Sequence, residues 1–295
     1  MPDRPVFRFA PSPNGELHLG HALSALVGYE RARAAGGRFL VRIEDIDATR
    51  SRPELVAGIF EDLRWLGLEW EEPVLVQSAR MEAYGTAARG LEGLGFLYRC
   101  FATRSEIEAA ARAGAADPDG APLYPGLWKG RSDVAIKGAL AEGRPYAVRI
   151  DMAAATRAAA ARLGGQPLTF TEIGAGGAHQ TVEAHPERWG DAVIVRKEVA
   201  TSYHLAVVVD DAWQGVTHVT RGRDLFAATD LHRLLQVLLG LPEPVYHHHR
   251  LIVNNDGRKL AKSARDTSLR SLRQRGVGVD EIRRLVGLTG QPTGT

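Results

Sequence analysis

The chain has 295 residues, of which 44% are hydrophobic and 24% charged, and its formal net charge is +2. This composition excludes a disordered, collagen-like or disulfide-stapled protein, and the small net charge excludes the generally basic surface that many nucleic-acid-binding proteins have. The single cysteine, Cys100, cannot form a disulfide within the chain. Because no apolar run approaches the ~18 residues of a membrane span and the first residues lack an apolar signal region, we expect a cytoplasmic protein.

Residues 1–96 alternate short apolar segments with longer segments of helical period. The apolar segments predict three strands, at 6–10, 39–43 and 74–76. The longer segments predict three helices, each followed by glycine, at 19–34, 53–66 and 81–94. Strands that alternate with helices of this length indicate an α/β fold, in which helices cover both faces of a doubly wound parallel sheet.

The alternation stops near residue 97, where irregular stretches rich in glycine, proline and alanine begin. We interpret residues 97–190 as an insertion between two halves of the sheet domain. The sheet pattern then resumes, with strands predicted at 192–195, 206–209 and 216–220 and a strongly amphipathic helix at 225–239.

The segment at residues 7–22, FRFAPSPNGELHLGHA, has the pattern of a strand, a turn and the start of a helix. A helix N-terminus presents free N–H groups and the positive end of its dipole, which suits a phosphate. His18 and His21 lie three residues apart, so both can face one ligand, and Gly20 lets a nucleotide ring approach the backbone. Taken alone, this pattern is equally compatible with a structural role.

A second segment, residues 259–263, places two lysines three residues apart shortly after a glycine-containing turn. A loop that carries Lys259 and Lys262 can stabilise the charge that builds on a departing pyrophosphate. Two lysines near the surface also fit an ordinary solvated loop, so the segment by itself leaves both readings open.

Together the two segments resemble the paired signatures of class I aminoacyl-tRNA synthetases. Four further blocks, at 8–13, 42–47, 207–211 and 217–225, resemble the glutamyl-specific subfamily. Glutamyl-tRNA synthetases continue with a large helical anticodon-binding region, whereas here only residues 264–295 follow the lysine motif. The chain therefore resembles the truncated glutamyl-Q tRNA(Asp) synthetase family, whose members load glutamate onto the queuosine base in the anticodon of tRNA(Asp).

The resemblance implies a domain organisation. A class I nucleotide-binding domain would be formed in two halves, 1–96 and 191–245, with an α+β, acceptor-binding-like insertion subdomain at 97–190 between them. Residues 246–295 would form the lysine-motif loop and a short helical tail, without an anticodon-binding domain.

The resemblance also implies the residues of the site. The catalytic residues would be His18, His21, Lys259 and Lys262. The glutamate-binding residues would be Arg8, Ala10, Ser12, Glu44, Tyr203 and Arg221. The ATP-binding residues would be Pro11, His18, Gly20, His21, Gly222, Asp224, Lys259, Lys262 and Ser263.

Free glutamate carries two carboxylates and one ammonium, so its pocket needs two cationic groups, such as Arg8 and Arg221, and one carboxylate, such as Glu44. From the residues alone, Arg221 also fits a surface position at a strand end. Tyr203 also fits a core position with its hydroxyl at the rim.

The implied function is ATP-dependent, tRNA-independent activation of L-glutamate, with Mg²⁺, and transfer of the glutamate to the queuosine base at the wobble position of tRNA(Asp). One alternative is a minimal glutamyl-tRNA synthetase that charges the 3′ terminal adenosine. Another is a non-catalytic RNA-binding paralogue, against which the intact histidine and lysine motifs argue. The partner would be the anticodon region of tRNA(Asp), and we expect a monomer that does not bind membranes.

Related enzymes carry a zinc site in the insertion, patterned Cys-x-Cys and then Tyr-x-x-x-Cys. The aligned positions here are Cys100, Ala102, Tyr124 and Trp128. Alanine and tryptophan offer no ligand atom, so we expect no structural zinc and an unreactive Cys100. Instead, we expect Phe101, Tyr124, Leu127 and Trp128 to form a small apolar cluster.

The tract at 247–249 consists of three histidines that alternate sides in a predicted strand, and we interpret it as packing near ATP rather than as a metal site.

Overall fold

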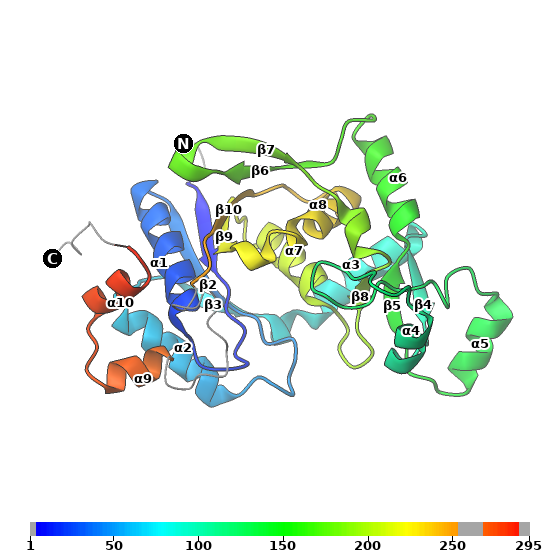
Figure 1. The fold of residues 1–295 in the computed structure, drawn as a ribbon, viewed down its shortest axis with the longest axis horizontal. Coiled ribbons are helices and arrows are strands. Elements are labelled where there is room, and N and C mark those ends of the chain that lie inside the picture. The colour runs from blue at the N-terminus through cyan, green and yellow to red at the C-terminus, as the bar shows by residue number, and fades with distance from the viewer. Residues whose placement is uncertain (1–3, 253–267, 289–295) are drawn as a thin grey trace.

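A seven-stranded sheet forms the centre of the computed structural model, which describes residues 4–252 and 268–288 (Figure 1). In spatial order its strands are β3 (Glu71–Val76), β2 (Arg38–Ile43), β1 (Val6–Phe9), β9 (His218–Gly222), β10 (Val245–His249), β6 (Thr169–Ile173) and β7 (His179–Glu183). Neighbouring strands are parallel except for β6 and β7, which form an antiparallel hairpin. The predicted doubly wound parallel sheet is therefore confirmed, and its winding reverses between β1 and β9.

Helices cover both faces of this sheet, as the alternation predicted. One face is covered by α1 (Leu19–Ala34), α2 (Pro53–Trp65), α9 (Leu269–Gln274) and α10 (Val279–Leu285), whose apolar residues form one core with Phe7 and Phe9 of β1. A second group of helices packs together on the other side. It consists of α3 (Met81–Gly93), α6 (Met152–Arg162), α7 (Tyr203–Trp213) and α8 (Ala228–Leu239). No helix within the described ranges is long and apolar enough to cross a membrane.

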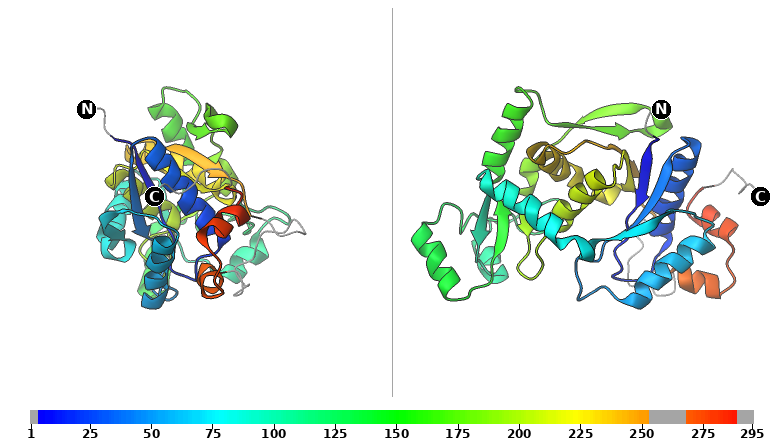
Figure 2. Two further views of the ribbon diagram at one scale, coloured as in Figure 1. Left: turned by 90° about the vertical axis from the view of Figure 1, so that its left-hand side faces the viewer. Right: turned by 180° about the vertical axis from the view of Figure 1, so that it is seen from behind.

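A separate three-stranded antiparallel sheet lies to one side of the main sheet, at the end opposite α9 and α10 (Figures 1 and 2). Its strands, in spatial order, are β4 (Leu97–Cys100), β5 (Ala147–Ile150) and β8 (Val193–Val195). The helices α4 (Arg104–Ala110) and α5 (Asp133–Ala141) accompany it, and short 3₁₀ turns lie at Gln77–Arg80, Ala175–Gly177, Pro186–Trp189 and Arg223–Leu225.

Residues 97–190 thus contribute to both sheets, because the β6–β7 hairpin extends the main sheet beyond β10. The strand predicted at 192–195 exists as β8, but it pairs with β5 in the small sheet and does not resume the main one. The division of the chain into domains remains a prediction.

The strand predicted at 206–209 is wrong, because these residues lie within the helix α7. A run of valines favours a strand when it is judged locally. Here Ser202 caps the helix by accepting a hydrogen bond from the Leu205 N–H, and α7 packs against both α3 and α8. Burial of Val207 and Val208 in that helical layer therefore overrides their intrinsic preference.

Candidate active site

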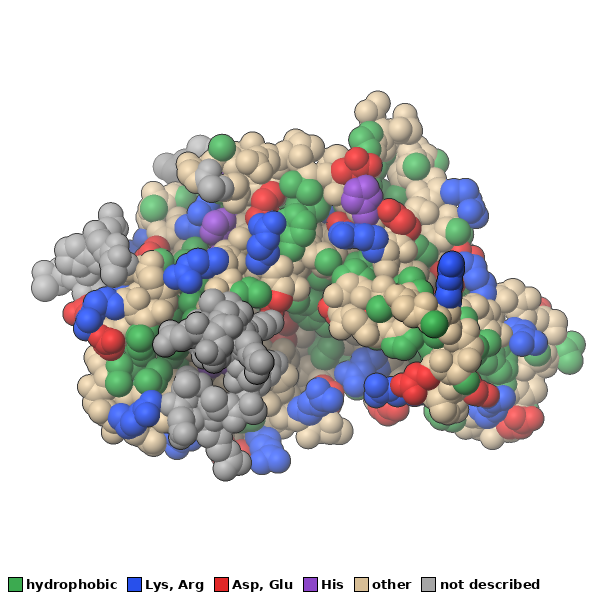
Figure 3. Space-filling view, viewed as in Figure 1, with side chains coloured by type: hydrophobic (Ala, Val, Ile, Leu, Met, Phe, Trp, Pro, Cys, Tyr) green, Lys and Arg blue, Asp and Glu red, His purple; other side chains and the backbone are tan. Residues whose placement is uncertain are grey.

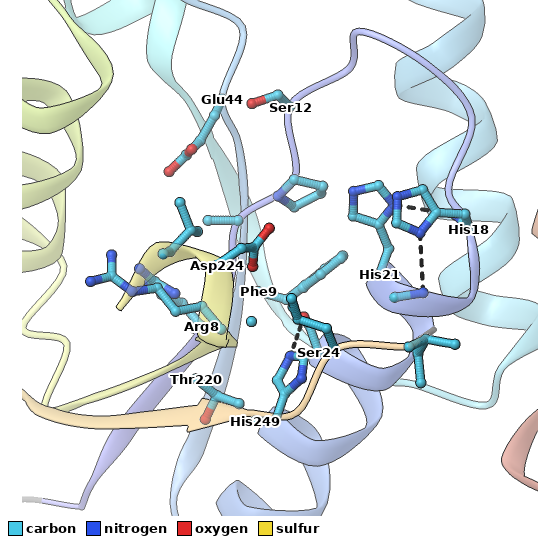
Figure 4. A pocket seen from close by; sticks show the side chains of 18 of the residues that line it. Arg8, Phe9, Ser12, His18, His21, Ser24, Glu44, Thr220, Asp224 and His249 are labelled. Carbon is cyan, nitrogen blue, oxygen red and sulfur yellow. Dashed lines mark hydrogen bonds between the residues drawn. The ribbon is translucent and has the colours of Figure 1, made fainter. Parts of the chain in front are cut away.

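A cavity of about 680 Å³ opens where the carboxyl ends of β1 and β9 meet, at the point where the winding of the sheet reverses (Figure 4). Doubly wound sheets bind their ligands in this position. In the view of Figure 1, the surface of the molecule is hollowed between the main sheet and the insertion, and lysine and arginine side chains lie around the hollow (Figure 3).

Every predicted site residue that the structure describes lines this cavity. These residues are Arg8, Ala10, Pro11, Ser12, His18, Gly20, His21, Glu44, Tyr203, Arg221, Gly222 and Asp224. Lys259, Lys262 and Ser263 lie outside the described residues.

One wall of the cavity is the start of α1, where the two histidines face each other. The Nδ1 atom of His18 accepts a hydrogen bond from the Gly20 N–H, and Nδ1 of His21 accepts one from the His18 N–H. The two rings lie 3.9 Å apart between centroids. A Cβ atom at Gly20 would lie 2.9 Å from Cε1 of His18, so this cap also requires glycine there. The histidines therefore cap the helix and line the cavity at once.

The opposite wall contains Arg8, and the fully buried Arg42 lies behind the lining and shares the carboxylate partner of Arg8. Arg8 of β1 lies 3.1 Å from Asp211, and Arg42 of β2 lies 2.7 Å from Asp211 and 3.1 Å from Glu44. Asp211 lies on the helix α7. The motif resemblance did not identify Arg42 and Asp211 as site residues, although both lie in blocks that resemble the glutamyl subfamily.

The pKa values of the two carboxyl groups shift in opposite directions, although the arginines lower both. Burial alone would raise the pKa of Asp211, but Arg8 and Arg42 lower it below the usual range. For Glu44, burial outweighs the attraction of Arg42 and Arg8, so its pKa is raised. A further cation beside Glu44 would stabilise its charged form. Glu44 is thus suited to bind a substrate ammonium, whereas the carboxylate of Asp211 is already paired with Arg8 and Arg42.

Arg221 differs from the other two arginines, because no carboxylate in the described part of the chain lies within ion-pair distance of it. Its side chain donates to Nε2 of His248 at 3.0 Å, Oγ1 of Thr229 at 2.7 Å, Nδ1 of His232 at 3.2 Å and the Tyr203 hydroxyl at 3.4 Å. Only 5% of Arg221 is exposed. A buried guanidinium held by neutral groups favours an anionic ligand, since its charge is otherwise uncompensated.

The histidine tract is divided between the two faces of the sheet, as the predicted alternation requires. His248 contacts Arg221, while His249 lines the cavity on the α1 side and lies 2.6 Å from Oγ of Ser24. His247 lies 3.2 Å from the carbonyl oxygen of Ile173. Within the described residues no group of three or more potential metal ligands occurs.

In the insertion, three residues of the predicted apolar cluster, Phe101, Tyr124 and Trp128, are joined by contacts and accompanied by two arginines, while the place of Leu127 in it stays a prediction. The rings of Phe101 and Trp128 lie 4.7 Å apart, and the Tyr124 hydroxyl accepts hydrogen bonds from the Trp128 N–H at 2.8 Å and the Cys100 thiol at 3.3 Å. The guanidinium of Arg149 lies 3.9 Å from the Tyr124 ring centre, and that of Arg144 lies 5.2 Å from the Trp128 ring centre. These side chains do not fit a tetrahedral zinc site, because Cys100 is the one strong ligand among the four aligned positions.

We predict that protein purified without a chelator contains no stoichiometric zinc. The side chains at the aligned positions are held by ring stacking and hydrogen bonds, and Cys100 is buried. Elemental analysis of the purified chain is the measurement. Stoichiometric zinc that is lost in a Cys100→Ala variant would contradict the prediction.

Comparison with known proteins places the chain among tRNA synthetases. The family model described as tRNA synthetases class I (E and Q), catalytic domain, matches residues 6–293. A glutamyl-Q tRNA(Asp) synthetase of Rhodobacter capsulatus is 47% identical over 294 residues, which cover 96% of this chain and 100% of that protein. A second one, of Symbiobacterium thermophilum, is 38% identical, with 97% of this chain and 87% of that protein covered.

Longer ligases match the chain over part of their length. In a glutamate tRNA ligase of Elizabethkingia meningosepticum, solved in complex with its amino acid, the match covers 93% of this chain and 53% of that chain. The identity is 27% and the TM-score 0.69. The glutamate–tRNA ligase of Prochlorococcus marinus is 36% identical, and the match covers 98% of this chain and 59% of that ligase.

Proposed function

The chain belongs to the class I tRNA synthetase (E and Q) catalytic-domain family, and we propose that it activates L-glutamate with ATP and transfers the glutamate to the queuosine base of tRNA(Asp). Activation would not need tRNA. The observation that best supports glutamate as the substrate is that one cavity is lined by the buried guanidinium of Arg221, which has no carboxylate partner among the described residues, and by the carboxylate of Glu44.

The cavity offers a complementary partner for each charged group of glutamate. Arg221 would bind one carboxylate, and Glu44 would bind the ammonium. Arg8, which is held in place by Asp211, would approach the second carboxylate. Ala10, Ser12 and Tyr203 would complete the walls. Because these groups lie on strand ends and on α7, they are held in position before the substrate arrives.

ATP would bind along the α1 side of the same cavity. The N-terminus of α1, with His18, Gly20 and His21, suits the phosphates, and Pro11, Gly222 and Asp224 lie where the rest of the nucleotide would pass. Lys259, Lys262 and Ser263 would contact the departing pyrophosphate. Mg²⁺ is usually bound through nucleotide phosphates and water, so it fits this site as an ATP-bound ion that offsets phosphate charge.

The proposed reaction has two steps. A carboxylate oxygen of glutamate attacks the α-phosphorus of ATP, and the bond to the β-phosphate oxygen breaks, giving glutamyl-adenylate and pyrophosphate. A hydroxyl of the RNA then attacks the activated carbonyl and AMP leaves. The chain's own residues contribute positioning and charge stabilisation, so no protein nucleophile is required.

The acceptor can be tested by locating the glutamate on the RNA. Bulk tRNA is charged with labelled glutamate and then cut with nucleases that separate the anticodon arm from the 3′ end. The proposal expects the label in the anticodon arm of tRNA(Asp). Label at the 3′ terminal adenosine would instead support the alternative function of a minimal glutamyl-tRNA synthetase, which the longer glutamate–tRNA ligase relatives favour.

The lysine motif provides a separate prediction. Lys262→Ala should lower the rate of glutamate activation by ~10²-fold, because it removes charge stabilisation that is used mainly in the transition state. Steady-state pyrophosphate exchange measures this rate. A variant with intact kcat and a raised KM for glutamate would contradict the assigned role.

A further inference from the structure

Arg221 is held by a buried hydrogen-bond network that reaches the β6–β7 hairpin. The Nε–H of Arg221 donates to Nε2 of His248, and Nδ1 of His248 lies 2.8 Å from Oε2 of Glu172 on β6. The other carboxylate oxygen of Glu172 accepts the backbone N–H of His248 at 2.9 Å. Glu172, His248 and Arg221 are all less than 9% exposed. A carboxylate, an imidazole and a guanidinium thus form a continuous chain away from water.

The direction of each hydrogen bond in this chain is fixed by the groups at its ends. A guanidinium can only donate, so Nε2 of His248 must accept and carries no proton. A carboxylate accepts, so Nδ1 of His248 must be the protonated nitrogen. Burial and the charge of Arg221 lower the pKa of His248 to about 4. Burial alone would raise the pKa of Glu172, but the hydrogen bonds from His248 lower it below its usual value. At neutral pH this hydrogen-bond network therefore consists of ionised Glu172, neutral His248 and charged Arg221.

Arg221 also donates to a second imidazole, that of His232, and this contact fixes the position of the proton on that ring in the same way. Nδ1 of His232 accepts from Arg221, which leaves the proton of His232 on Nε2, 3.2 Å from Nδ1 of His204. Burial and Arg221 lower the pKa of His232 well below its usual value, so this ring is also neutral. The two neutral rings orient Arg221 without cancelling its charge, which remains available to a carboxylate in the cavity.

We propose that Glu172 is a positioning residue for substrate binding: through His248 it fixes the orientation of Arg221 toward the substrate carboxylate. This inference rests on the proposed function, since it assumes that Arg221 binds glutamate. It also connects the hairpin of the insertion to the amino-acid site, although Glu172 itself does not line the cavity.

Glu172→Gln is the most informative variant. A carboxylate accepts both N–H groups of His248, whereas a glutamine side chain has one acceptor oxygen and one NH₂ group. The backbone N–H cannot change, so the imidazole must lose its Nδ1 partner or move its proton to Nε2, where it would oppose the Nε–H of Arg221. We expect the KM for glutamate in pyrophosphate exchange to rise about tenfold, with kcat and the KM for ATP within about twofold of the wild type.

The matched control is Glu183→Gln, the same substitution on the exposed strand β7 of the same hairpin, which should leave all three parameters unchanged. An unchanged KM for glutamate in Glu172→Gln would overturn the proposal. So would an equal rise in the KM for ATP together with a lowered Tm, because that pattern indicates a structural role only.

A second readout does not require activity. In the wild-type chain labelled with ¹⁵N-histidine, NMR spectra at pH 7 should give His248 as a neutral ring protonated at Nδ1. Glu172→Gln should either shift the proton to Nε2 or, with the proton retained, move the Nδ1 resonance because its hydrogen bond to the carboxylate is lost. A His248→Gln variant assigns the signal. A wild-type His248 protonated at Nε2, or His248 resonances unchanged by the substitution, would overturn the proposal. If the wild type shows no glutamate-dependent exchange, the proposed function fails, while the spectra still decide whether Glu172 controls His248.

Discussion

Arg221→Ala is expected to raise the KM for glutamate by about 100-fold and to leave the KM for ATP nearly unchanged. The substitution removes a buried arginine of the cavity wall whose guanidinium has no carboxylate partner among the described residues, so the substrate carboxylate loses its charge-assisted hydrogen bonds. Pyrophosphate exchange at varied glutamate and varied ATP measures both constants.

Arg223→Ala is the matched control. Arg223 lies two residues further along the chain, is exposed and stacks over Phe226 rather than lining the cavity. It should behave like the wild type toward both substrates. If Arg221→Ala weakened glutamate and ATP equally, the arginine would be supporting the fold and not binding glutamate.

Asp211→Asn should have the largest effect on stability, lowering the free energy of unfolding by about 3 kcal/mol. Asp211 is the shared carboxylate of Arg8 and Arg42, and Arg42 is completely buried. Without the negative charge, two buried guanidiniums repel each other and only Glu44 remains to pair with Arg42. Urea unfolding measures the loss, and the KM for glutamate should rise as Arg8 and Glu44 move.

Asp210→Asn provides the comparison, because Asp210 is the neighbouring buried carboxylate on α7 and does not line the cavity. It accepts hydrogen bonds from Gln77, Arg80 and Tyr84. This variant should also be destabilised but should keep the wild-type KM for glutamate. A raised KM for glutamate in both variants would mean that loss of stability, and not loss of the Asp211 ion pairs, impairs the site.

Much of the fold could be predicted because strong local patterns coincide with the final packing. The helix at 19–34 begins at a capping histidine and buries Leu23 and Leu26, and the predicted bounds match α1. The valine run at 206–209 shows the limit of such reasoning. Its helix is stabilised by layers formed from residues more than a hundred positions earlier in α3 and shortly later in α8, which no local window contains.

The lining of the cavity could be predicted by motif resemblance, but the residues that hold the lining in place could not. Arg42 and Asp211 touch lining residues, and Glu172 reaches Arg221 through His248. These contacts form because strands β1, β2, β9, β10 and β6 pair in an order that differs from their order in the chain. An arginine in a predicted strand and two carboxylates directly after a valine run were visible in the sequence. Their pairing was not, since it depends on how α7 packs over the sheet.

At the four positions aligned with the family's zinc ligands, the sequence alone was more informative. The loss of ligand atoms at Ala102 and Trp128 is visible in the sequence, and the rings of Phe101 and Trp128 are in contact as the predicted apolar cluster requires. The stacking of Arg144 and Arg149 on rings of this cluster was not expected, because both residues come from a different part of the insertion.

Glutamate-dependent exchange of labelled pyrophosphate into ATP, with purified chain, Mg²⁺ and no RNA, is the most direct test of the proposed glutamate site. We predict exchange with glutamate and a much weaker response to glutamine, which lacks the second carboxylate that the two arginines would bind. An absence of exchange with glutamate at every Mg²⁺ concentration, or equal exchange with glutamine, would contradict the assignment.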